Sequence, residues 1–250
     1  PLLSVIIPIL NEKDNIKPLV NEIIAALDGT CDFEIIFVND ASTDDTILVL
    51  TELIGKYKFL RFISHNARSG QSAGLRTGIL AAKGTLIVTL DGDGQNDPGD
   101  IPKLLTQYQN SSFPGFLMIT GHRVNRKDTW AKRKASRMAN NIRHRFLKDD
   151  NPDTGCSLKL YERELFLRLP YFDHMHRFLP ALAKRENCKV EVVSVNHRNR
   201  THGKSNYTNL DRLFVGIPDL LGVMWLIKRS PNAVSYTHLR AHETWRNLVC

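Results

Sequence analysis

Three stretches of the chain are apolar and rich in β-branched residues, with no helical period. They are Leu3–Leu10, Phe33–Val38 and Leu86–Leu90. Runs of this length without alternation are typical of strands buried on both faces of a parallel sheet. Between the first two, apolar residues recur every three or four positions over Asn15–Leu27, which predicts a helix.

Strand and helix patterns alternate up to about residue 120. We expect further strands at Leu60–Ser64 and Phe116–Thr120, and further helices at Gln71–Ala82 and Pro98–Tyr108. This short spacing predicts a doubly wound α/β domain whose central sheet is mostly parallel and flanked by helices. The chain lacks the G-x-G-x-x-G and G-x-x-x-x-G-K-[ST] patterns, so dinucleotide and P-loop sites are disfavoured.

The second half of the chain is less regular. Gly155–Tyr161 and Lys189–Val195 are expected to be strands, and Leu210–Arg229 an amphipathic helix pair interrupted at Pro218. We therefore divide the chain into an α/β half, residues 1–121, and a C-terminal extension, residues 122–229. The remaining tail, residues 230–250, resembles a translated sequencing adapter over Tyr236–Thr244, and we exclude it from the functional argument.

The charge of the chain is positive and unevenly distributed. The 250 residues carry a net charge of +8, and His122–Lys148 holds ten Lys or Arg against the single acidic residue Asp128. Such a run suits a phosphate-bearing partner, an anionic membrane surface or nucleic acid, and it also suits a solvated basic helix. Nucleic acid is not expected, because only Trp130 and Phe146 are aromatic in this run.

The four cysteines form no C-x-x-C pair, so the sequence predicts neither a disulfide framework nor a zinc site. A reducing compartment is therefore expected. The longest apolar stretch, Leu213–Ile227, contains Pro218 and Asp219 and is shorter than the roughly 18 residues that a membrane-spanning helix needs.

The most informative polar motif is Asp91-Gly92-Asp93-Gly94-Gln95, which follows the apolar run Leu86–Leu90 directly. Ligands of open α/β sheets bind at the carboxyl ends of strands, and glycine allows a ligand to approach the backbone closely. Two carboxylates at such a place suit Mg²⁺ or Mn²⁺ bridging the phosphates of a nucleotide. The alternative is a surface Asp-Gly turn without a ligand.

Several motifs together resemble a known family. Ser4–Glu12, Val38–Asp44, Gly70–Ser72 and Leu90–Pro98 resemble the inverting family-2 glycosyltransferases of GT-A fold. Three more segments resemble the polyprenyl-phosphate branch of that family, the dolichol-phosphate mannose synthase-like enzymes: His176-Arg177, Arg198–Lys204 and Asp219–Trp225. The likeness covers Leu2–Arg229. One departure is Asn39, where many relatives carry Asp, and it leaves the identity of the base open.

The resemblance implies a role for each matching position. Pro8, Asn11 and Glu12 would line the nucleotide pocket, and Asp40 would contact the base or ribose. Asp91 and Asp93 would hold the metal and the donor diphosphate, with Gln95 near the metal. Arg123 and Arg133 would meet the acceptor phosphate, and Asp93, Arg123 and Arg133 would be catalytic. A second phosphate-binding group would be Arg198, Arg200 and Lys204.

By the same resemblance, residues 1–121 would be the nucleotide-sugar-binding half and residues 122–229 the acceptor side, next to the membrane. The implied reaction transfers a sugar from a GDP- or UDP-sugar to a polyprenyl phosphate, with Mg²⁺ or Mn²⁺, at the cytoplasmic face of a membrane. The protein would bind that surface through Leu210–Arg229 without spanning the bilayer. The alternative is that this apolar stripe packs on the sheet as core. An alternative is transfer to a saccharide or protein hydroxyl, which needs a carboxylate base, and Asp153 is the best candidate for it.

Overall fold

The computed structural model of the chain describes residues 2–124, 145–147, 149, 151–199 and 209–229. Their strands form one sheet in the order β3-β2-β1-β4-β6-β5-β7. β6 runs antiparallel to β4 and β5, and every other neighbouring pair is parallel. The bounds are β1 Leu3–Ile9, β2 Phe33–Asn39, β3 Leu60–Ser64, β4 Leu86–Thr89, β5 Leu117–Arg123, β6 Lys159–Glu162 and β7 Lys189–Val195.

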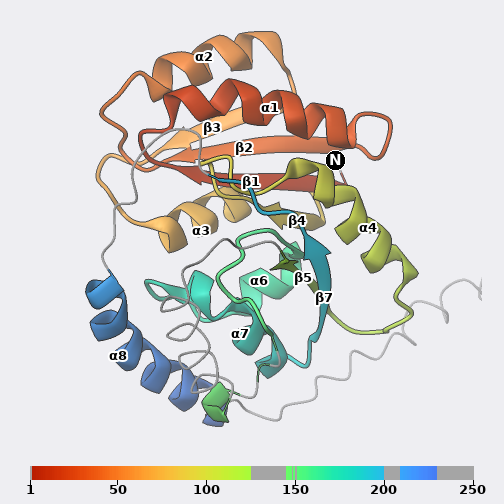
Figure 1. Cartoon of the computed structure of the whole chain (residues 1–250), viewed down its shortest axis with the longest axis vertical. Helices are drawn as coiled ribbons and strands as arrows, with labels where there is room; N and C mark the ends of the chain where they lie inside the picture. The colour runs from red at the N-terminus through yellow and green to blue at the C-terminus, as the bar shows by residue number, and fades with distance from the viewer. Residues whose placement is uncertain (1, 125–144, 148, 150, 200–208, 230–250) are drawn as a thin grey trace, which may run out of the picture.

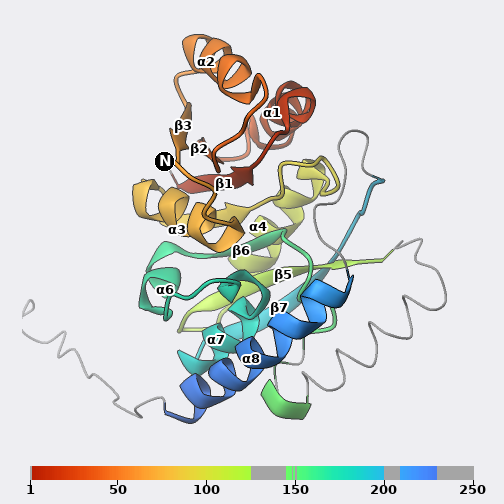
Figure 2. The same ribbon diagram turned by 90° about the vertical axis from the view of Figure 1, so that its left-hand side faces the viewer.

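Helices cover both faces of this sheet (Figures 1 and 2). One face packs against α1 (Lys13–Leu27), α2 (Thr46–Lys56) and α4 (Ile101–Asn110). The other packs against α3 (Gln71–Ala81), α6 (Arg163–Arg168), α7 (Leu179–Arg185) and α8 (Asn209–Lys228). Successive strand residues point to opposite faces, so Val5 and Ile7 enter the first core while Ile6 enters the second. The predicted mostly parallel α/β sheet is confirmed.

Two predicted boundaries differ from the structure. The expected strand Gly155–Tyr161 begins only at Lys159, because the N–H of Cys156 donates to the carbonyl of Asp153 at 3.2 Å and closes a turn there. β6 then inserts between β4 and β5. The expected strand Phe116–Thr120 extends to Arg123, since β5 pairs with β7 along its whole length.

The prediction of a helix pair over Leu210–Arg229 was wrong. α8 is one helix with Pro218 inside it. A proline removes a single backbone hydrogen bond, and the turns after Pro218 are held by packing. Val223 is fully buried, and Leu220 and Met224 contact the cluster beside α7. Within the described residues, no helix is both long and apolar enough to cross a membrane.

Candidate active site

The carboxyl ends of β1, β2 and β4 meet at one edge of the sheet. β1 lies between β2 and β4 and pairs with both in parallel. The chain therefore leaves the neighbouring strands β1 and β4 at a point where the strand order reverses, and ligands of open α/β sheets bind in that crevice. The predicted residues Asn11 and Glu12 follow β1, Asp40 follows β2, and Asp91 and Asp93 follow β4. The structure brings these five residues to one edge.

The loop after β4 is folded tightly against β1. A Cβ added to Gly92 would lie 2.3 Å from Cγ2 of Ile9, so only glycine fits between the two aspartates. The amide of Gln71, at the start of α3, donates from Nε2 to Oδ1 of Asp91 at 2.7 Å. The N–H of Gln95 donates to Oδ1 of Asp93 at 3.1 Å. The two carboxylates are thus held in place by neighbouring amides.

The electrostatics of this loop favour a bound cation. Burial raises the pKa of Asp91, and the charge of Asp93 raises it further, whereas Ser157, Lys159 and Arg123 lower it. A divalent cation would relieve the repulsion between the two carboxylates. Among the described residues, no group of three or more His, Cys, Asp or Glu side chains could hold a metal by itself. The carboxylate pair therefore fits Mg²⁺ or Mn²⁺ shared with substrate phosphates, the way Mg²⁺ is commonly bound.

Two residues near this loop had no role in the sequence-based prediction. Gln71 lies in Gly70–Ser72, one of the motifs that resemble the family, but only the fold brings it to Asp91. Lys159 is almost fully buried at the start of β6, and its Nζ donates to the carbonyl oxygens of Cys156 and, at 3.4 Å, Thr154. Burial lowers the pKa of Lys159. A lysine between two leucines in a buried strand was the signal in the sequence.

Asn11 joins the first two strand-end loops. Its backbone is left-handed, with φ 56°, and its Oδ1 accepts from the N–H of Thr43 at 2.7 Å. Its own N–H donates to Oγ of Ser42 at 2.9 Å. Next to it, Oε2 of Glu12 accepts from Nδ2 of Asn15 at 2.5 Å. Asn11 and Glu12 therefore shape the loops at this edge of the sheet, and their contact with a nucleotide stays a prediction.

Pro8, at the end of β1, forms part of the contact with α3. A Cβ added to Gly74 of α3 would lie 3.0 Å from Cβ of Pro8, so the helix lies very close to the strand. Pro8 therefore sets the distance between β1 and the first turns of α3, from which Gln71 reaches Asp91.

Asp40 is buried and holds the loop that leads into α3. Its Oδ1 accepts from the N–H of Ser69 at 2.7 Å and lies 2.9 Å from Nδ1 of His65, and its Oδ2 accepts from the N–H of Gly70 at 2.8 Å. Burial alone would raise the pKa of Asp40, but these hydrogen bonds outweigh it and the pKa is lowered. Both carboxylate oxygens of Asp40 are thus engaged by other groups of the protein. A contact of Asp40 with the base or ribose stays a prediction.

Arg123, at the end of β5, is paired with Asp153. Its Nε donates to Oδ2 and its Nη2 to Oδ1, both at 2.7 Å, and its N–H reaches Oδ2 at 3.2 Å. Both side chains are largely buried. Arg123, which was predicted to bind the acceptor phosphate, is thus paired with Asp153, the candidate base of the hydroxyl-transfer alternative. Arg133, the other predicted acceptor residue, lies outside the described residues.

Of the predicted phosphate-binding group near residue 200, the structure describes Arg198 only. Its Nη1 donates to Glu22 at 2.7 Å and its Nη2 to Asp97 at 2.6 Å. Its N–H donates to the carbonyl of Gln95, the residue predicted to lie near the metal. Arg200 and Lys204 lie outside the described part of the chain.

His176 faces the start of α3 rather than the crevice loops. Its Nδ1 lies 2.9 Å from Oγ of Ser72, which also accepts from the N–H of His176 at 3.3 Å. The hydroxyl that accepts from the backbone can also donate to Nδ1, an arrangement that suits a neutral imidazole with its proton on Nε2. Burial lowers the pKa of His176 to about 3.

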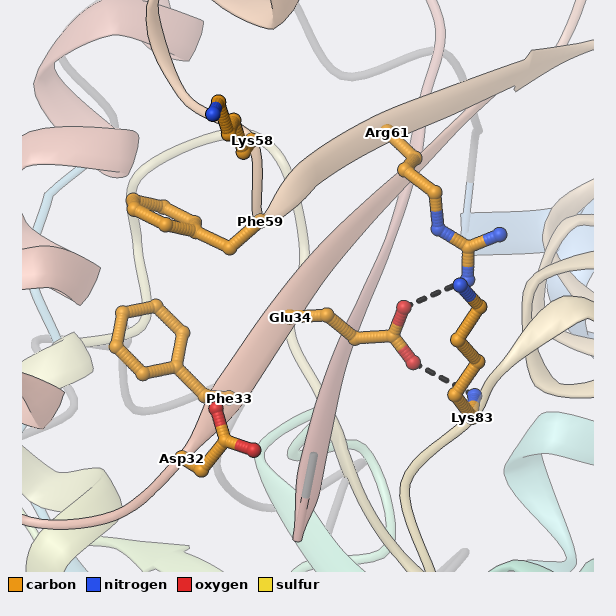
Figure 3. Close-up of a pocket in the computed structure, with 7 residues that line it drawn as sticks. All are labelled: Asp32, Phe33, Glu34, Lys58, Phe59, Arg61 and Lys83. Carbon is orange, nitrogen blue, oxygen red and sulfur yellow. Dashed lines mark hydrogen bonds and ion pairs between the residues drawn. The ribbon is translucent and has the colours of Figure 1, made fainter.

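A separate pocket of about 170 Å³ lies at the opposite edge of the sheet, where β2 and β3 begin (Figure 3). Its central carboxylate, Glu34, accepts from Arg61 and from the N–H of Lys83, both at 2.6 Å. The rings of Phe33 and Phe59 form its other side, 5.1 Å apart. Because it lies at the amino edge of the sheet, this pocket takes no part in the crevice.

Comparison with known proteins decides the family. Residues 4–169 match the domain described as glycosyl transferase family 2, which covers well over half of the chain. The chain belongs to this family. The resemblance inferred from the motifs is confirmed, and with it the prediction of a glycosyltransferase at the level of the family.

The chain is also similar to named sugar transferases. Dodecaprenyl-phosphate galacturonate synthase from Rhizobium johnstonii is 36% identical over 231 residues, covering 90% of this chain and 67% of the relative. Undecaprenyl-phosphate 4-deoxy-4-formamido-L-arabinose transferase from Edwardsiella ictaluri is 31% identical over 206 residues, covering 82% and 62%. The chain thus spans about two thirds of the length of these relatives.

Solved structures share the fold at low sequence identity. Glucosyl-3-phosphoglycerate synthase from Mycobacterium tuberculosis, in complex with Mn²⁺, UDP and glucosyl-3-phosphoglycerate, has a TM-score of 0.65 at 18% identity, covering 92% of this chain and 81% of that one. A mannosyltransferase from Pyrobaculum calidifontis, in complex with GDP-Man and Mn²⁺, has a TM-score of 0.60 at 18% identity, covering 82% and 58%. The predicted GT-A fold is confirmed.

Proposed function

We propose that this protein transfers a sugar from a nucleotide-sugar donor to a polyprenyl phosphate, with inversion at the anomeric carbon. The family and the named activities of the relatives support this reaction. The observation that carries it is the pair Asp91 and Asp93, which lies at the reversal of strand order with hydrogen-bonded carboxylates. This is the position at which an α/β sheet binds a nucleotide diphosphate.

The chemistry needs few groups from the protein. An oxygen of the acceptor phosphate forms a bond to the anomeric carbon, while the bond from that carbon to the donor diphosphate breaks and its electron pair leaves with the nucleoside diphosphate. A divalent cation held by Asp91 and Asp93, with Gln95 beside it, would neutralise charge on the leaving diphosphate. A phosphate monoester is already ionised, so this transfer requires no carboxylate base.

Donor and acceptor would lie on opposite sides of the aspartate loop. Pro8, Asn11, Glu12 and Asp40 form the nucleotide side, where a GDP- or UDP-sugar would bind. On the acceptor side, the pair of Arg123 with Asp153 uses Nε and Nη2 and not Nη1. Nη1 would then donate to the lipid phosphate, supported by Arg133, Arg200 and Lys204, since guanidinium groups suit phosphate oxygens.

The acceptor lipid places the reaction at a membrane surface. On α8, Ile217, Leu221 and Trp225 recur every four residues and are 54%, 59% and 60% exposed. Side chains at this spacing lie on one face of a helix, and exposed Lys228 and Arg229 follow it. An apolar stripe with adjacent cations suits the interface of an anionic bilayer. Free Cys31, Cys156 and Cys188 are typical of a reducing compartment, which supports the cytoplasmic face.

The test is a transfer assay with purified protein, Mn²⁺ and a panel of radiolabelled UDP- and GDP-sugars. Undecaprenyl phosphate, dolichyl phosphate and soluble saccharides serve as alternative acceptors. We expect label to enter the organic phase with one donor and a lipid phosphate only. Label on a saccharide hydroxyl, with none on lipid phosphate, would replace this function with the hydroxyl-transfer alternative. Retention of the α-linkage of a donor in the product would contradict inversion.

A further inference from the structure

The segment that follows β7 is attached to the loop that carries the two aspartates. Asn96 and His197 form an isolated antiparallel bridge. On one side of it, the N–H of Arg198 donates to the carbonyl of Gln95 at 2.9 Å. On the other, the N–H of Asn196 donates to Oδ2 of Asp100 at 2.6 Å. The backbone after β7 thus follows the loop after β4 over several residues.

The side chain of Arg198 strengthens this attachment from the outside. Its Nη1 donates to Oε2 of Glu22 on α1 at 2.7 Å, and its Nη2 donates to Oδ1 of Asp97 at 2.6 Å. The second oxygen of Asp97 accepts from Nδ2 of Asn196 at 3.2 Å. One guanidinium therefore connects α1, the aspartate loop and the segment after β7. Hydrogen bonds between charged groups of this kind are stronger than those between neutral ones.

The same loop contacts the aspartates on its inner side. The N–H of Gln95 donates to Oδ1 of Asp93 at 3.1 Å. Oδ1 of Asn96 accepts from the N–H of Asp91 at 3.2 Å and from Oγ of Ser157 at 2.6 Å. Gln95 and Asn96 thus contact the predicted metal ligands on one side and the segment of Arg198 on the other. A shift of Asp97 would be passed along the backbone of Asn96 and Gln95, and from the N–H of Gln95 to Asp93.

We propose that Arg198 is a positioning residue that holds the loop of Asp93 to Asp97 in the shape needed for the cation and the donor diphosphate. This departs from the role of phosphate ligand that the family resemblance implied for it. Both of its Nη atoms donate to carboxylates, which neutralise the charge of the guanidinium and hold it toward the protein. The proposal rests on the proposed function, since it concerns the metal and donor of that reaction.

The two roles differ in what they predict for Glu22. If Arg198 acts through the loop, Glu22→Gln weakens the same contact from the other side and lowers affinity for the cation. If Arg198 binds phosphate directly, loss of the competing Glu22 charge leaves substrate binding unchanged or improves it. Glu22 itself lies on α1 and is half exposed, so the substitution leaves the fold intact.

The experiment is calorimetric titration of Mn²⁺ into protein saturated with UDP, for wild type, Arg198→Ala, Glu22→Gln and the double variant. We expect each single variant to bind Mn²⁺ about two- to fivefold more weakly, the range of a half-exposed ion pair. The double variant should bind Mn²⁺ no more weakly than Arg198→Ala, because the contact that Glu22→Gln weakens is already absent in Arg198→Ala. Arg198→Lys should restore part of the loss. Glu52→Gln on α2 is the matched control, since it removes an exposed ion pair of Glu52 with Lys17 of α1, also at 2.7 Å.

Steady-state kinetics add a second readout. Arg198→Ala should lower kcat and leave KM for the lipid phosphate near the wild-type value. Unchanged Mn²⁺ affinity in Glu22→Gln, together with a raised KM for either substrate in Arg198→Ala, would overturn the positioning role and make Arg198 a phosphate ligand. Wild-type affinity in all variants would overturn it as well. Absence of Mn²⁺–UDP binding by the wild-type protein would instead contradict the proposed function itself.

Discussion

The side chain of Arg123 donates two hydrogen bonds of 2.7 Å to Asp153, from Nε to Oδ2 and from Nη2 to Oδ1. The backbone N–H of Arg123 donates a third, to Oδ2 at 3.2 Å. The arginine thus orients the carboxylate that the hydroxyl-transfer alternative would use as a base, and the aspartate in turn orients the arginine expected to meet the acceptor phosphate. A carboxylate held in this way is a poor base, because both of its oxygens already accept hydrogen bonds from the arginine.

Replacement of Asp153 by Ala should therefore affect stability and acceptor binding together. Removing one partner of a buried ion pair typically costs about 3–5 kcal/mol, since the other charge is left buried and unpaired. We expect a lower urea midpoint and weaker binding of a short prenyl phosphate. A variant with a wild-type midpoint and intact acceptor binding, but no turnover, would identify Asp153 as a catalytic base. Arg123→Lys, which cannot form the fork, should show a milder form of both effects.

Asp93→Asn should leave the fold intact and reduce turnover by orders of magnitude, because the cation that neutralises the leaving diphosphate contributes several kcal/mol. The check is initial rate against Mn²⁺ concentration, with thermal unfolding to verify the fold. Asp28→Asn is the control, since Asp28 is an exposed carboxylate at the C-terminal end of α1, far from the loops after the strands. Full activity of the wild-type protein in EDTA would refute metal dependence.

The buried imidazole of His176 should make stability depend on pH. Its pKa is about 3 in the folded protein, against about 6.5 in the unfolded chain. Between these values the unfolded chain binds the extra proton, so the free energy of unfolding rises with pH over this window by up to about 1.4 kcal/mol per unit. This contribution is fully present above pH 6.5 and is lost as the pH falls toward 3.

Urea midpoints at pH 7.5, 6.0 and 5.0 test this expectation. His176→Gln should be less stable than wild type at pH 7.5 and should lose less stability on acidification. His122→Gln controls for loss of an imidazole elsewhere. An identical pH slope in wild type and His176→Gln would show that the pKa of His176 is the same in the folded and unfolded states.

The exposed stripe of α8 should carry membrane binding. A double variant, Leu221→Glu with Trp225→Glu, should remain in the supernatant when wild type sediments with anionic vesicles at low salt. Ile47→Glu with Leu48→Glu is the matched control, because these residues of α2 are also apolar and exposed. Equal sedimentation of both double variants, or wild type that never sediments, would show that α8 is no membrane contact.

The sequence alone determined the elements whose signal is local. The apolar runs of β1, β2 and β4 bury both faces of a strand, so composition predicted them without knowledge of their partners. The polar residues after these runs predicted the edge at which the crevice lies, because parallel strands present their carboxyl ends together. The sequence alone therefore places Asp91 and Asp93 in the candidate site.

Only the tertiary structure decided which polar side chains bind the protein itself. Asp40 receives the N–H of Ser69 and Gly70 from a loop about thirty positions away, and Arg198 meets Glu22 across 176 positions. The local sequence around Asp40 or Arg198 does not indicate these partners. The same limit applies to α8: its apolar residues were visible in the sequence, but the side that packs beside α7 and the side that stays exposed depend on the neighbouring helix. Pairing over such separations is settled by the packing of the whole chain, since burial requires each polar group to find a partner wherever the fold provides one.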